Sequence, residues 1–197
     1  MICLLIPYIV STMLGGGLMS QQEREKKSAH ADVKSDAIVL TEGIVGGFVP
    51  AHVRLKVIVL PKKNTVEIWV KSQSDRTAKP RYVKGEVPRP EFEKLTATIQ
   101  AEKFWKLPVE SPRGSQDIYQ LDTSLHVRLG KKSWSNGGPA GCVHGQSEIQ
   151  ASGKQRRFFQ QVVEQIKASA EGRAKLEIDA GEFNQIEKKI DQWWNQE

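Results

Sequence analysis

Cysteine is scarce in this chain, and the short motifs that mark several common enzyme classes are missing. The 197 residues contain two cysteines, Cys3 and Cys142, and Cys3 lies in a hydrophobic N-terminal stretch. The one remaining cysteine cannot build a disulfide framework within a folded domain. The sequence also lacks a Walker loop, Gly-x-Gly-x-x-Gly before a helix, Gly-x-Ser-x-Gly and His-Glu-x-x-His. These absences exclude the classes that are defined by those motifs.

Charged side chains are missing from residues 1–20, a hydrophobic leader whose apolar run is broken by Pro7. The polar stretch 21–35 follows and is predicted to be a disordered neck. This layout is typical of a signal peptide or an uncleaved anchor, although no Lys or Arg precedes the apolar run. The chain is then expected to be extracytoplasmic or membrane-anchored. Met19 is an alternative start, and a chain that begins there is expected to be cytoplasmic.

The rest of the sequence predicts one domain over residues 36–173 and a C-terminal amphipathic helix within residues 174–197. The composition, with 39% hydrophobic and 26% charged residues, is that of an ordinary globular protein. The formal net charge is +6. The cations cluster in turns rather than along one helix face, and no nucleic-acid-binding pattern accompanies them. We therefore expect a solvated basic surface rather than a surface for nucleic acid or an acidic partner.

Alternation of apolar and polar residues predicts the strands. They are residues 38–40, a hairpin of residues 52–60 and 65–71 with one apolar face, and a strand or strand pair within residues 118–129. The charged, proline-rich segment 72–89 lacks this alternation and is predicted to be a mobile loop. Residues 130–145 are predicted to be a glycine-rich turn region.

Helical spacing of apolar residues follows two start signals. Pro90 occupies a favourable first helical position, and the helix that it begins should end before Pro108. Ser152 is a plausible N-cap for a second helix, which should end near Gly172. The final helix carries Phe183, Ile186, Ile190, Trp193 and Trp194 at helical spacing. The order predicts an α+β fold: an antiparallel sheet of about four strands, two main helices on one face and an extra C-terminal amphipathic helix.

Groups that could perform chemistry are few. Cys142 and His144 lie two residues apart in a glycine-rich segment, but an extended segment gives the thiol no held and oriented base. Together with His126 they lack the spacing of a zinc site. Asp117 and Asp122 are predicted to cap backbone N–H groups of a turn rather than to hold calcium or act as acid and base. The sequence therefore predicts a non-enzymatic domain without a metal or cofactor.

One family resemblance depends on the order of short segments. The segment 41–48, Thr-Glu-Gly-Ile-Val-Gly-Gly-Phe, precedes the hairpin and a helix that ends in Phe104-Trp105-Lys106-Leu107, and Asp117-Ile118-Tyr119 then precedes a strand. In this order residues 38–167 resemble the emfourin-type domain, a small α+β family. Its characterised member is a protein inhibitor of thermolysin-like metallopeptidases. The resemblance implies a peptidase as partner, and it identifies no inhibitory residue.

Our leading hypothesis is a non-enzymatic protein-binding domain, with a peptidase-inhibitor-like module as its specific form. The candidate contact residues are Gly43, Gly46, Gly47 and Phe48 in the glycine-rich loop, and Trp193 and Trp194 at the C-terminal helix. The alternative is a cell-envelope structural or interaction domain that docks on a membrane or a subunit through that Trp-ended helix. A third hypothesis is a hydrolase built on Cys142 and His144.

Overall fold

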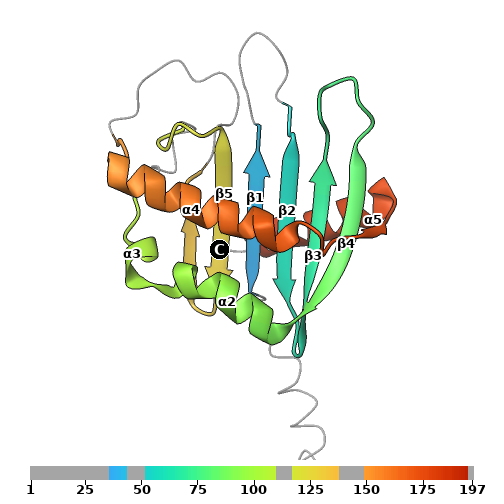
Figure 1. Cartoon of the computed structure of the whole chain (residues 1–197), viewed down its shortest axis with the longest axis horizontal. Helices are drawn as coiled ribbons and strands as arrows, with labels where there is room; N and C mark the ends of the chain where they lie inside the picture. Colours follow the sequence, from blue (N-terminus) through green and yellow to red (C-terminus); the bar gives the residue numbers. More distant parts are fainter. Residues whose placement is uncertain (1–35, 44–51, 110–116, 138–148, 195–197) are drawn as a thin grey trace, which may run out of the picture. The chain divides into compact units, whose positions relative to one another are not determined.

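A seven-stranded antiparallel sheet forms the centre of the fold, with strand order β6-β5-β1-β2-β3-β4-β7 (Figure 1). The computed structural model describes residues 36–43, 52–109, 117–137 and 149–194, which belong to one compact unit of residues 34–197. The strands are β1 (Ala37–Glu42), β2 (Leu55–Pro61), β3 (Thr65–Ser72), β4 (Arg81–Pro88), β5 (Thr123–Leu129), β6 (Lys132–Ser135) and β7 (Leu176–Glu177).

Four helices accompany the sheet in the described ranges: α2 (Arg89–Gln100), α3 (Glu102–Trp105), α4 (Gly153–Ala170) and α5 (Ala180–Trp194). None of these described helices is long and apolar enough to cross a membrane. The N-terminus of α4 has the predicted cap. The Ser152 hydroxyl accepts a hydrogen bond from the Gln155 N–H, and the Gln155 side chain accepts one from the Ser152 N–H.

One face of the sheet is covered by α2, α3 and α4 (Figure 1). The strands contribute alternate residues to this core, such as Val57 and Val59 from β2. From α4 the buried residues are Phe159, Val162, Val163, Ile166 and Ala170, which recur at helical spacing. The predicted apolar stripe of this helix is confirmed.

The opposite face is covered by α5. Ile58 and Leu60 of β2 point to this side and are 0% and 3% exposed, beside Trp69 of β3 and Phe183 of α5. β2 thus carries apolar residues on both of its faces, because both faces are buried. The prediction of a hairpin with one apolar face was wrong for this reason: a second layer covers the side that holds Ile58.

The number of strands also differs from the prediction. The mixed α and β architecture with an antiparallel sheet is confirmed, but the sheet has seven strands rather than about four. The segment 72–89, predicted to be a mobile loop, contains β4, in which Val83 and Val87 are buried while Lys84 and Glu86 alternate with them. Proline residues at its ends and Gly85 in its middle obscured this alternation. The predicted turn region 130–145 likewise contains β6, which buries Trp134.

Candidate functional site

The predicted glycine-rich contact region begins where β1 ends. Gly43 has φ +79°, which suits glycine, and its N–H donates to the Asp122 carbonyl at 2.9 Å. A side chain here would collide with Arg54, whose Nε lies 2.6 Å from the position of a Cβ atom. Gly43 is therefore held between Arg54 and the turn 117–122. Gly46, Gly47 and Phe48 lie outside the described residues, as do the leader 1–20 and the neck 21–35.

The turn 117–122 lies beside Gly43 and is shaped by Asp117. Its carboxylate accepts a hydrogen bond from the Asp122 N–H at 2.6 Å, as predicted for a capping aspartate. Gln120 and Asp122 both have positive φ, 58° and 48°. Tyr119 is fully buried, and its hydroxyl donates to the Pro108 carbonyl at 2.6 Å. Burial raises the pKa of Tyr119, so the phenol stays protonated and acts as a hydrogen-bond donor in the core.

The loop 73–80 between β3 and β4 stands at the same end of the sheet and is organised by Asp75 (Figure 1). The Asp75 carboxylate accepts hydrogen bonds from the Thr77 hydroxyl at 2.6 Å, the Thr77 N–H at 2.8 Å and the Ala78 N–H at 2.9 Å. These bonds, led by the one from the hydroxyl, lower the pKa of Asp75 to about 2. The Gln73 amide closes the loop by donating to the Ala78 carbonyl at 2.8 Å.

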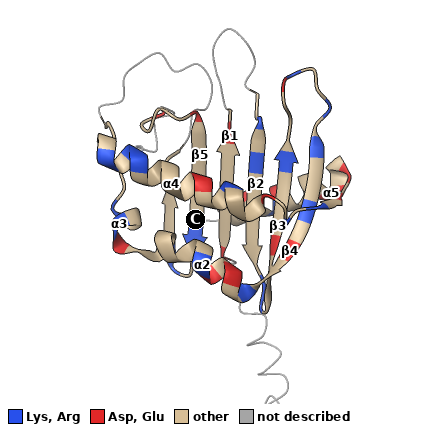
Figure 2. Cartoon of the chain, viewed as in Figure 1, with Lys and Arg blue, Asp and Glu red and all other residues tan. Residues whose placement is uncertain are grey.

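Two cations of this loop point to solvent. Arg76 and Lys79 are exposed, and neither forms an ion pair with another described residue. Arg81, the next cation along the chain, pairs with Glu177 at 3.3 Å. Figure 2 shows these positive charges at the end of the sheet where β3 stops and β4 starts. The loop thus combines a fixed backbone with exposed positive charge.

A hollow of about 250 Å³ lies directly below the loop, on the α4 side of the sheet. Its floor consists of two cross-strand rows, Leu55–Ser72–Arg81 and Val57–Val70–Val83. The end of α4 and its continuation form a wall, with Ala170, Glu171, Gly172 and Ala174. Four of these six floor residues are apolar, and an apolar centre with a polar rim is typical of protein-contact surfaces. We use the term loop end for Gly43, Arg54, the loop 73–80, the turn 117–122 and this hollow.

Trp193 and Trp194, the other predicted contact residues, lie far from the loop end in sequence and contact the sheet. Both rings are half-buried against the core under α5. The Trp194 ring lies 5.1 Å from the His126 ring, and the ammonium of Lys189 lies 5.1 Å from the centroid of Trp193. The Arg128 guanidinium donates to the Trp193 carbonyl at 3.1 Å. The structure therefore does not bring the two tryptophans together with Gly43.

A Ser–His pair under α5 was missed by the sequence reasoning. The Ser124 hydroxyl lies 3.0 Å from His126 Nε2, because residues two apart on β5 share one face. Such a pair is the core of a nucleophilic site only where a substrate can reach the hydroxyl. Ser124 is 5% exposed and Trp194 packs beside His126. The pair therefore belongs to the packing of α5, and the spacing Ser-x-His on a strand was the signal that could have found it.

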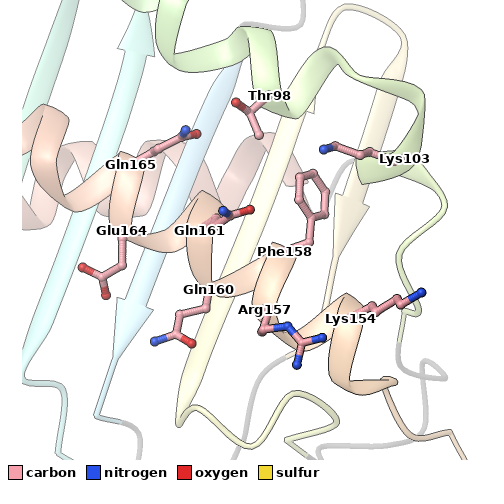
Figure 3. Close-up of a pocket in the computed structure, with 9 residues that line it drawn as sticks. All are labelled: Thr98, Lys103, Lys154, Arg157, Phe158, Gln160, Gln161, Glu164 and Gln165. Carbon is pink, nitrogen blue, oxygen red and sulfur yellow. The ribbon is translucent and has the colours of Figure 1, made fainter.

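A broad groove of about 900 Å³ runs between α4 and the α2–α3 pair (Figure 3). Three cations, three glutamines and one half-buried ring line most of it: Lys103, Lys154, Arg157, Gln160, Gln161, Gln165 and Phe158. The ammonium of Lys103 lies 4.1 Å from the centroid of the Phe158 ring.

The groups expected to offer nucleophilic or metal chemistry are not assembled in the described ranges. Cys142 and His144 lie outside those ranges, and the described residues contain no group of three or more acidic, His or Cys side chains placed to hold a metal ion. Comparison of the chain with protein-family models, with curated proteins and with solved structures found no match in any of the three.

Proposed function

We propose that this chain is a non-enzymatic protein-binding domain that contacts its partner through the loop end, with a peptidase-inhibitor-like module as the specific form. The observation that carries the proposal is the loop 73–80. Its backbone is fixed by hydrogen bonds to Asp75, and its cations Arg76 and Lys79 are exposed and form no ion pair within the described part of the chain. A loop fixed before binding loses little conformational entropy in a complex.

The hollow beneath the loop supports the same function. Leu55 and Val70 are only partly buried on its floor, although both are apolar. A side chain from a partner that enters a pocket of this kind removes apolar surface from water, as the anchors of protein interfaces do. The rigid loop above the pocket supplies directional contacts and positive charge. The hollow and the charged loop together fit a partner surface that is acidic or that combines acidic and apolar side chains.

The experiment is capture of partners from an extract of the source organism on the immobilised full chain, followed by mass spectrometry. A matched assay measures inhibition of a thermolysin-like metallopeptidase at roughly micromolar chain concentration. We expect a protein to be retained by the native chain and lost by the double variant Arg76→Glu/Lys79→Glu. The control is Lys63→Glu/Lys131→Glu, which reverses two exposed cations in the turns at the other end of the sheet.

Each outcome has a defined meaning. Retention of a peptidase together with inhibition supports the inhibitor-like form. Retention of another protein that depends on Arg76 and Lys79 supports the protein-binding domain without that form. The proposal fails when the native chain retains nothing, or when both double variants retain the same proteins as the native chain.

The two other hypotheses stay predictions. For the envelope-docking domain, Trp193 and Trp194 would have to face a partner, whereas their rings pack on this chain's own sheet in the structure. The hydrolase hypothesis depends on Cys142 and His144, outside the described residues. The signal-peptide, anchor and Met19-start alternatives concern residues 1–20 and are likewise predictions.

A further inference from the structure

We propose that the groove between α4 and the α2–α3 pair is a second binding surface, separate from the loop end, that takes a short acidic segment of a protein. The groove is open, so a chain segment can enter it without movement of either helix (Figure 3). Its lining residues come from α2, α3 and α4, and none of them belongs to the loop end. The inference therefore does not depend on the function proposed above.

Three cations of the groove have no ion-pair partner among the described residues. Lys103, Lys154 and Arg157 form no ion pair with any described residue. By contrast, Lys106, the C-cap of α3, pairs with Glu102 at 2.6 Å, and Lys167 of α4 pairs with Glu42 at 3.2 Å. Three unpaired cations gathered in one concave surface attract carboxylates more strongly than the same charges spread over a convex surface.

The cations gather at one end of the groove. Figure 3 shows Lys103, Lys154 and Arg157 around Phe158, near the start of α4, whereas Glu164 and Gln165 lie toward the other end. The N-terminal turn of α4 contains no acidic residue, so the partial positive charge of the helix start adds to that of the side chains. The contact with the Phe158 ring keeps the Lys103 ammonium above the groove. The structure thus provides a defined place for a carboxylate.

Amide groups line the groove from its middle to the end that holds Glu164 (Figure 3). The side chains of Gln160, Gln161 and Gln165 form no hydrogen bond with a described residue. A glutamine amide both donates and accepts, so it matches the N–H and C=O groups of a peptide backbone. The stripe from Lys154 to Gln165 spans 11 steps of the helix, or about 16 Å, at about 1.5 Å per residue. An extended peptide covers that length with about five residues.

A polynucleotide fits the groove less well than an acidic peptide. Nucleic acid needs a track of cations for successive phosphates and aromatic faces for its bases. Here the positive end is followed by Glu164, and the one aromatic ring that lines the groove, Phe158, is covered by Lys103. A phosphate backbone that continues along α4 past the cations would meet the Glu164 carboxylate.

The test uses fluorescein-labelled hexaglutamate and the full chain, with fluorescence anisotropy at low ionic strength. We expect saturable binding by the native chain and about tenfold weaker binding by Lys154→Gln/Arg157→Gln, because two exposed cations are lost. Both residues are exposed, so the variant should keep the native circular dichroism spectrum. The control Lys63→Gln/Lys131→Gln removes the same charge from exposed turns outside both the groove and the loop end. It should bind the peptide within about twofold of the native chain.

Two results would overturn the inference. One is the absence of saturable binding to the native chain, or an equal loss in both double variants, which would show attraction to net charge alone. The other is tighter binding of a labelled thymidine decamer than of hexaglutamate, abolished by Lys154→Gln/Arg157→Gln, which would assign the groove to nucleic acid. Because Lys154 and Arg157 lie outside the loop end, this experiment fails or succeeds independently of the partner capture described above.

Discussion

The imidazole of His126 and the indole of Trp194 lie 5.1 Å apart between their centroids, with their planes tilted by 31°. This contact joins β5 to the last turn of α5. Burial of the imidazole lowers the pKa of His126 to about 4, and the positive charge of Lys56 contributes to this shift. The native structure therefore holds a neutral imidazole under α5 at neutral pH.

The titration of His126 predicts a pH-dependent stability. In the unfolded chain a histidine has a pKa of about 6.5. As the pH falls from about 6.5 to about 4, the unfolded state binds a proton that the folded state does not, so the free energy of unfolding decreases by up to about 3 kcal/mol. Stability from this group is full above pH 6.5. Urea titrations across this range should show a shallower pH slope for His126→Asn than for the native chain. Equal slopes in the two chains would contradict the assignment.

Removal of α5 should destabilise the sheet rather than leave an intact core. A chain that stops after Arg173 lacks Phe183 and Ile190, which are 0% and 2% exposed. It also exposes Ile58 and Trp69. Each buried side chain of this kind contributes about 1.5–3 kcal/mol, so the loss should exceed about 3 kcal/mol. Urea unfolding and size-exclusion chromatography should show a lower midpoint and self-association. A monomer with the native midpoint would show that α5 contributes nothing to the stability of the sheet.

Gly85 should tolerate no side chain. A Cβ atom at this position of β4 would lie 2.0 Å from the Arg173 carbonyl oxygen, in the segment that links α4 to β7. Gly85→Ala therefore has to displace backbone, and we expect a loss of about 2 kcal/mol in the free energy of unfolding. Gly153→Ala is the matched control, because its Cβ would have 3.7 Å to the nearest atom, on Arg157. The control should change stability by less than about 0.5 kcal/mol. Equal effects of the two variants would contradict this close approach.

The loop 73–80 should lose its fixed backbone when Asp75 is changed. Asp75→Ala removes the acceptor for the Thr77 and Ala78 N–H groups, so these amides should exchange with solvent faster. The pKa of Asp75 is about 2, so the native loop should keep its protection down to about pH 3 and lose it as the carboxylate is protonated below that. Ser74→Ala is the control, since its hydroxyl contacts Asp75 at 3.2 Å without bridging the loop. Unchanged exchange in Asp75→Ala would contradict the role of the carboxylate.

The helices were predictable because their signals are local. The cap at Ser152 and the apolar spacing of α4 depend on residues within a few turns of one another, and both were confirmed. Pro90 also falls in the first turn of α2. The end of that helix was less accurate: α2 ends at Gln100, and α3 continues the chain toward Pro108. Ala101 between them has ψ 136°, so the helix breaks there.

The second layer was not predictable from the same signals. Ile58 appeared to lie on a polar face with Lys56, and only the packing of α5, more than 120 residues further along the chain, explains its burial. The ion pair of Lys56 with Glu187 shows how a charged neighbour is accommodated there. At the loop end, the capping role of Asp117 was predicted correctly. The role of Asp75 was not, because Ser74 and Thr77 in the same charged loop are also residues that can cap a turn.

The burial of both faces of β2 has a consequence for synthesis on the ribosome. All strands from β1 to β6 leave the ribosome before α5, at about 5–20 residues per second. The nascent sheet can assemble against α4 while the side that holds Ile58, Leu60 and Trp69 is still open to water. Until α5 has been synthesised and covers this side, the nascent chain therefore exposes an apolar surface that chaperones can bind.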